Sequence, residues 1–179
     1  MSDNKVITWG CRGSCVTTDF RMMKYGFNTT CISIETEDTI YLVDAGSGIT
    51  DFDKYYYENQ LFLKKIILFF THYHHDHLWG LGFTEFLFDN KVVKEIIGTG
   101  NIKSIINRYF GPPFFPVQIV NLNNLIFKSI HANSSYTING LTFDTILLKH
   151  TQKCIGYKFY LGEKTFSIIL DYDYRNDKN

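Results

Sequence analysis

The amino-acid sequence predicts one domain in which helices pack on a mixed β-sheet, that is, an α/β or α+β fold. Of its 179 residues, 45% are hydrophobic and 17% are aromatic, which is typical of a compact domain with a well-filled core. Glycine and proline separate short apolar runs of strand length. Strand-like runs come first along the chain, and helices interleaved with strands follow them.

The first predicted strands are rich in β-branched and aromatic residues. They cover residues 6–9, 30–34 and 39–43, and the third leads into a glycine-containing turn at residues 44–48. Residues 66–70 form a continuous apolar run, which is expected of a central strand covered on both faces. Periodicity alone leaves a buried helix open as an alternative for this run.

The later elements are predicted from periodicity and capping. Helices are expected over residues 83–88 and from Asn101 onward, where Asn101 is a suitable N-cap and apolar residues follow at helical spacing. Further strands are expected over residues 92–97, 141–146, 156–161 and 165–170. Helices packed on a mixed sheet are typical of an α/β or α+β fold.

Composition limits the function classes. Lys+Arg and Asp+Glu both total 18, and no basic arm is present that would bind a long polyanion, so a small anionic substrate is favoured over a large RNA.

The N-terminus has no apolar signal region, and no apolar run reaches the roughly 18 residues that a membrane span needs. We therefore expect a cytoplasmic protein without a membrane segment. The cysteines, Cys154 included, are expected to be packing thiols.

A histidine cluster is the strongest functional signal. Four of the 6 histidines lie within residues 72–77, and Asp76 lies among them. Imidazole and carboxylate groups form a ligand set that suits zinc. Residues two apart in an extended segment point the same way, so His72 and His74 are expected to hold one metal, and Asp76 and His77 a second. The alternative is a histidine-rich surface loop or affinity tag, which the internal position after a buried-type strand disfavours.

Chemistry-bearing residues also stand at strand ends. Asp44, His72, His150 and Asp171 each follow a predicted strand, where a loop projects side chains from a rigid scaffold. If these ends lie on one rim of the sheet, the four residues form one site. Asp173 lies two residues beyond Asp171 and is the alternative; Asp171 is preferred because it closes the apolar strand.

These motifs resemble those of a known family. Residues 71–77 resemble the HxHxDH signature of the metallo-β-lactamase superfamily, and residues 42–46 resemble its preceding Asp motif. The resemblance extends over nearly the whole chain and implies an α+β fold, the αββα sandwich, with residues 1–179 as a single domain. The segments that resemble phosphodiesterase-like bacterial members related to tRNase Z are 9–14, 25–31, 80–83 and 113–117.

The resemblance also implies a ligand set for two divalent ions, with zinc expected and manganese as the alternative. By this resemblance His72, His74 and His150 ligate the first ion, Asp76 and His77 the second, and Asp171 bridges both. Asp44 would hydrogen-bond a ligand and fix its orientation. Members of the family usually continue to a further histidine, so we expect this domain to lack the family's C-terminal part. Water, a neighbouring subunit or another side chain would then complete the second site, or a single ion binds.

A dinuclear centre lowers the pKa of bound water toward neutrality, and the sequence therefore predicts hydrolysis by metal-bound hydroxide, with Asp76 as the catalytic residue that orients it. The expected substrate is a phosphodiester in a small cyclic or short nucleotide. RNA processing of the tRNase Z type, thioester or lactam hydrolysis, and a metal- or nucleotide-binding module without turnover remain open as alternative functions.

The resemblance implies a homodimer. Phe114 and Phe115 offer faces for stacking on a base, although core packing is favoured in so aromatic a chain.

Overall fold

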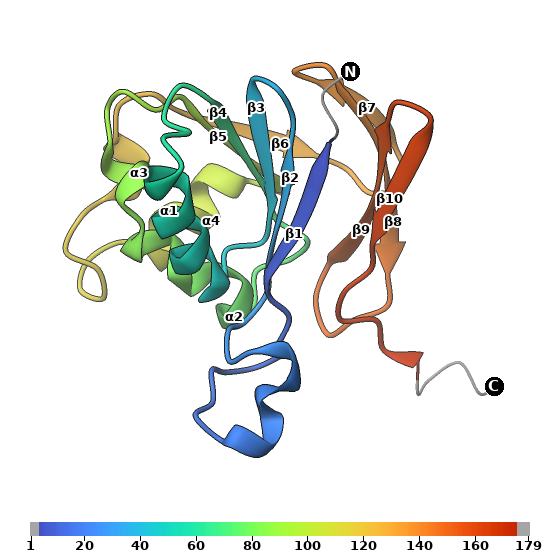
Figure 1. The fold of residues 1–179 in the computed structure, drawn as a ribbon, viewed down its shortest axis with the longest axis horizontal. Helices are drawn as coiled ribbons and strands as arrows, with labels where there is room; N and C mark the ends of the chain where they lie inside the picture. The colour runs from blue at the N-terminus through green and yellow to red at the C-terminus, as the bar shows by residue number, and fades with distance from the viewer. Residues whose placement is uncertain (1–3, 175–179) are drawn as a thin grey trace.

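The computed structural model describes residues 4–174, which form three layers (Figure 1). Helices cover one face of a six-stranded sheet, and a four-stranded antiparallel sheet packs on its other face. This arrangement confirms the predicted α+β sandwich. Within the described residues no helix covers the outer face of the four-stranded sheet. No helix in this part of the chain is long and apolar enough to cross a membrane.

The six-stranded sheet has the order β1-β2-β3-β4-β5-β6. Its first three strands pair antiparallel, whereas β3 to β6 are parallel. The predicted central strand at residues 66–70 is confirmed as β4, and helical geometry is excluded there. The strands are β1 Lys5–Gly10, β2 Cys31–Glu35, β3 Thr39–Val43, β4 Lys65–Phe69, β5 Lys94–Thr99 and β6 Leu125–Ile130.

The helices differ in part from the prediction. Asn101 caps the predicted helix, because its Oδ1 accepts a hydrogen bond from the Ser104 backbone N–H at 3.1 Å. The short helix expected over residues 83–88 is confirmed as the shorter α3, which begins two residues after the end of a 3-10 helix, whereas the longest helix, α1, was not predicted. The helices are α1 Gly48–Glu58, α2 His75–Leu78, α3 Glu85–Phe88 and α4 Ile102–Tyr109, with 3-10 helices η1 Phe20–Tyr25, η2 Trp79–Phe83 and η3 Ile119–Asn121.

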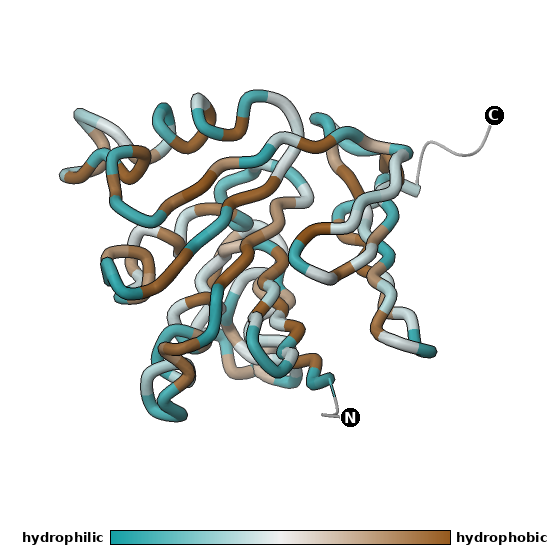
Figure 2. The backbone as a smooth tube through the Cα atoms, turned by 90° about the horizontal axis from the view of Figure 1, so that it is seen from above, coloured by the Kyte–Doolittle hydropathy of each residue, from teal (hydrophilic) through white to brown (hydrophobic). Residues whose placement is uncertain are grey.

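The four-stranded sheet has the order β10-β9-β8-β7. Buried residues of β8 alternate with exposed ones along most of its length, as expected for a sheet with one covered face. Aromatic rings from both sheets meet between them, such as Phe69 and Phe143, whose ring centroids lie 5.0 Å apart. Figure 2 shows the hydrophobic segments running through the interior strands. The strands are β7 Ser135–Ile138, β8 Leu141–Leu148, β9 Cys154–Leu161 and β10 Lys164–Ile168.

A buried carboxylate ties the sheets together. The Glu95 side chain on β5 is only 3% exposed and contacts Lys65 of β4 and Lys128 of β6, the latter at 2.8 Å. Asn139, in the turn between β7 and β8, donates to the same carboxylate at 3.2 Å. Burial raises the pKa of Glu95, but the hydrogen bonds from Lys128 and Lys65 outweigh it and leave the pKa below its ordinary value.

Replacing Glu95 by alanine should destabilise the fold by about 2 kcal/mol, because two partly exposed lysines lose their partner. Urea unfolding followed by circular dichroism measures this change. As a control, Lys54→Ala removes an exposed ion pair with Glu58 and should cost about 0.5 kcal/mol or less. Because the folded pKa of Glu95 is lowered, its contribution is present above pH 4.5 and is lost as the pH falls further. Equal stability losses in both variants would contradict this role.

Candidate metal centre

The histidine-rich segment changes conformation midway. It leaves β4 as an extended chain, and His74 still has extended backbone angles (φ −66°, ψ 154°) before α2 begins at His75. His72 and His74 therefore share one side, as predicted. The expectation of an extended chain was wrong for Asp76 and His77, which lie on the first turn of a helix. That turn brings these adjacent side chains to the same site.

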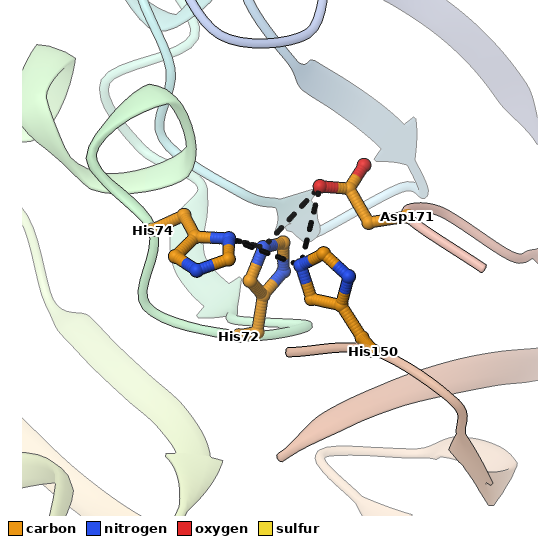
Figure 3. A group of neighbouring side chains, drawn as sticks. All are labelled: His72, His74, His150 and Asp171. Carbon is orange, nitrogen blue, oxygen red and sulfur yellow. Dashed lines mark hydrogen bonds and ion pairs between the residues drawn. The ribbon is translucent and has the colours of Figure 1, made fainter. Parts of the chain in front are cut away.

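Two groups of side chains converge at the rim of the sheets. His72, His74, His150 and Asp171 each offer a ligand atom within 4.8 Å of the others, and Figure 3 shows the four pointing toward one another. Asp171 belongs also to a second group, which Asp76 and His77 complete. All six residues predicted as ligands are therefore brought together. Asp173 lies in neither group.

The distances within the first group are short. His72 Nε2 and His150 Nε2 each lie 3.0 Å from His74 Nδ1, and the Asp171 Oδ2 atom lies 3.4 Å from His72 Nε2. Three nitrogens and one oxygen gathered this closely match the four-ligand set of a tetrahedral cation. His72 and His74 follow the six-stranded sheet, whereas His150 and Asp171 follow β8 and β10 of the other sheet.

The second group contains a buried nitrogen without a hydrogen-bond partner. His77 is fully buried, and its Nε2 atom makes no hydrogen bond within residues 4–174. This atom lies 3.4 Å from Asp76 Oδ2 and 3.5 Å from Asp171 Oδ2. A buried polar atom without a partner is costly, and a cation between this nitrogen and the two carboxylates would satisfy it. The donor set therefore fits a divalent metal.

The electrostatics of the site favour positive charge. Burial lowers the pKa of His77, but Asp171 and Asp44 outweigh burial and raise it to about 10. The close contacts with the His72 and His77 rings, at 3.4 and 3.5 Å, hold the pKa of Asp171 well below its ordinary value. Burial lowers the pKa of His74, and the nearby imidazoles of His72 and His150 lower it further. The ionised carboxylates thus stabilise a cation in the centre of the site.

Asp44 holds the second group in place. Its buried carboxylate accepts hydrogen bonds from the Thr71 N–H and hydroxyl, both at 2.8 Å, and lies 2.7 Å from His77 Nδ1. A proton on His77 Nδ1 leaves Nε2 facing the carboxylates as a potential metal ligand. Asp44 therefore has the orienting position that the sequence predicted. Thr71, which was not singled out, also lies 3.0 Å from His72 Nδ1.

Another contact could not be found from spacing. The backbone N–H of Ser14, in the segment between β1 and β2, donates to Asp76 Oδ2 at 2.7 Å. Ser14 adopts a positive φ of 68°, which is uncommon for a residue other than glycine. Ser14 and Asp76 are 62 positions apart in the sequence. The sequence drew attention to Ser14 only because residues 9–14 resemble a segment of the phosphodiesterase-like family members.

Cys154 lies beside the site but not in it. The thiol is buried, and its Sγ atom lies 3.8 Å from His72 Nδ1, on the side of the ring away from His74. Burial, together with the charges of Asp44 and Asp171, raises the pKa of Cys154 to about 12. The thiol is therefore neutral and packs against the ring.

The layered sheets and the histidine–aspartate centre at the strand ends are the features of a metallo-β-lactamase fold. Residues 25–104 match the model of the metallo-beta-lactamase superfamily, a superfamily of metal-dependent hydrolases. The match confirms the predicted resemblance. No sequence among the curated proteins matches this chain.

Solved structures share this fold. The metallo-beta-lactamase fold protein YhfI from Bacillus subtilis is 19% identical with a TM-score of 0.64, covering 91% of this chain and 61% of its own. A diphosphatase of the PhnP family is 14% identical with a TM-score of 0.62, covering 88% and 62%. The short form of human tRNase Z is 16% identical with a TM-score of 0.61, covering 92% and 68%. The chain thus spans about three-fifths of the length of the first two proteins.

Removing a central ligand should deplete the bound metal. We expect the purified protein to carry a divalent ion and His72→Ala to weaken zinc affinity at least about tenfold, because this ring lies at the centre of the first group. Elemental analysis and competition with a fluorescent chelator measure this change. His131→Ala is the matched control, since His131 lies in neither group. Equal metal contents in the two variants would contradict the assignment.

Asp44→Asn should weaken metal affinity about 10- to 100-fold without removing a ligand, because the amide no longer fixes the orientation of His77. The same chelator competition gives the affinity, and thermal unfolding of chelated protein separates it from a loss of stability. Asp38→Asn, an exposed position, is the control. An unchanged affinity in Asp44→Asn would show that the contact with His77 is dispensable.

Proposed function

We propose that the protein is a metal-dependent phosphodiesterase that hydrolyses a small cyclic or short nucleotide. The observation that carries the proposal is the pair of ligand groups sharing Asp171, which provides positions for two cations close together. Two-metal sites are suited to phosphoryl chemistry, because two ions neutralise charge on the attacking and leaving oxygens. The site is accessible from solvent, since the Asp171 side chain is 30% exposed.

In this proposal each residue has a distinct task. His72, His74, His150 and Asp171 hold the first divalent ion, and Asp76, His77 and Asp171 hold the second. The bound ions supply an activated water and a charge sink for the phosphate. Asp76, positioned by the Ser14 N–H, orients the attacking water and accepts its proton at a carboxylate oxygen. Asp44 keeps the proton of His77 on Nδ1 and leaves Nε2 free for binding.

The balanced charge of the chain favours a small substrate. The chain carries 18 basic and 18 acidic residues, so long-range attraction for a polyanion is weak. A small nucleotide needs no such attraction, because the ions themselves neutralise its phosphate. The resemblance in fold to tRNase Z supports RNA processing of the tRNase Z type as the second candidate. If this candidate is right, RNA should inhibit hydrolysis of a small phosphodiester by competition.

Hydrolysis of bis(p-nitrophenyl) phosphate tests the proposal. We expect turnover with added zinc or manganese, loss of turnover on chelation, and a fall in kcat of about 100-fold or more in Asp76→Asn, because this carboxylate handles the proton of the attacking water. His131→Ala should retain the wild-type rate. Metal-loaded protein without turnover would support a binding module, and preferential cleavage of a p-nitrophenyl thioester would support acyl hydrolysis. Either outcome would overturn the proposal.

A further inference from the structure

A second feature lies on the other side of the ligand-bearing segment. Tyr73 and His75 line a cavity of about 730 Å³, whereas His72 and His74 belong to the first ligand group. The alternation follows from the extended backbone, because successive side chains point to opposite sides. The other walls come from η2, α4 and the segment that carries Phe114 and Phe115. A volume of this size is within the usual range for small-molecule sites.

Aromatic rings form most of these walls. The rings of His75 and Trp79 are nearly parallel, with an interplanar angle of 6° and centroids 6.2 Å apart. Phe83 and Phe114 are 63% and 86% exposed, so the expected core packing of Phe114 is wrong. Phe115 packs against Phe110 with ring centroids 5.2 Å apart. Exposed and partly exposed ring faces at a cavity provide stacking surfaces for a planar ligand.

The charge in the cavity is unbalanced. Arg108 of α4 lines it, and no acidic side chain is among the described lining residues. Within residues 4–174 the Arg108 side chain makes no hydrogen bond or ion pair. A guanidinium without a partner is suited to bidentate binding of a phosphate or carboxylate. Ser104 and Asn101 add polar groups to the same wall. The cavity thus combines stacking surfaces with one anion-binding group.

We propose that this cavity binds a mononucleotide, with its base among the aromatic rings and its phosphate on the Arg108 guanidinium. The base fits the stacked rings because every nucleobase presents a planar π-face. The phosphate neutralises the charge of the Arg108 side chain. This site lies on the opposite side of segment 72–75 from the first ligand group, so it does not require a bound metal. Its failure is therefore distinguishable from failure of the hydrolase proposal.

Trp79 provides a direct probe of occupancy. The chain has two tryptophans, and Trp9 packs against Phe52 and Tyr55 and does not line the cavity. The Trp9→Phe variant therefore leaves Trp79 as the sole tryptophan, which can be excited selectively over the tyrosines. We expect adenosine monophosphate to quench it saturably, before and after chelation of metal. Adenosine lacks the anion and ribose 5-phosphate lacks the base. Each should bind at least about tenfold more weakly than adenosine monophosphate.

Substitutions in the Trp9→Phe background test the anion contact. Arg108→Ala should weaken binding of adenosine monophosphate about tenfold and leave adenosine unchanged, and Arg108→Lys should restore part of the loss. Lys103→Ala is the matched control, because Lys103 is an exposed cation on the same helix that does not line the cavity. Thermal unfolding checks that each variant folds.

Four outcomes would overturn the inference. The first is the absence of saturable quenching by adenosine monophosphate, and the second is equal affinity for adenosine and adenosine monophosphate. The third is an equal loss of affinity in Arg108→Ala and Lys103→Ala. The fourth is a fluorescence change that depends on protein concentration alone and accompanies dimer formation in sedimentation. If Phe114→Ser abolished that dimer, the cavity would be assigned to a second copy of the chain.

Discussion

The buried carboxylate of Asp44 is the constraint on which the geometry of the site depends. An ionised group removed from water must be satisfied by hydrogen bonds, and both oxygens of Asp44 are used by Thr71 and His77. These contacts join the end of β3 to the segment that follows β4. Since that segment carries four of the six candidate ligands, one buried carboxylate fixes the direction in which it leaves the sheet. The positive φ of Asp44, 60°, is a strained conformation that such contacts maintain.

Further contacts hold the same segment against both sheets. The Ile155 N–H of β9 donates to the Thr71 carbonyl at 2.9 Å, and the Ala45 N–H donates to the His77 carbonyl at 2.7 Å. Gly46 permits this close approach, because a Cβ atom there would lie 2.3 Å from the Asp76 carbonyl oxygen. The ligands are therefore mounted on backbone that is bonded on either side. Such preorganisation lowers the cost of gathering several like-charged or polar groups around one point.

The sequence predicted the features that depend on local residue patterns, such as apolar runs and polar residues at strand ends. The continuous apolar run of β4 and the polar residues at strand ends located the site, because parallel strands β3 and β4 end at one edge and the second sheet adds its own ends there. The pattern failed where tertiary burial overrides local preference. Tyr55, Tyr56 and Tyr57 favour strands by propensity, yet they lie in α1, where Ile49, Phe52 and Tyr56 face the core. β7 was not predicted, because it is short and only partly buried and so leaves a weak hydrophobic pattern. The Ser14–Asp76 contact was not predicted either, because it joins two segments that share no sequence pattern.

The stretch from His72 to His75, which is extended up to the start of α2, gives the ligand segment two functional faces. One face presents His72 and His74 to the metal ligands, and the other presents Tyr73 and His75 to the aromatic cavity. Tyr73 is anchored there, because its hydroxyl donates to the Thr99 carbonyl at the end of β5 at 2.6 Å. A shift of one residue in this stretch would exchange the faces, moving imidazoles into the cavity and phenol into the metal centre. The bonds of Asp44 and Tyr73 therefore set the register from both sides, and the same alternation that gathers the ligands also builds the neighbouring cavity.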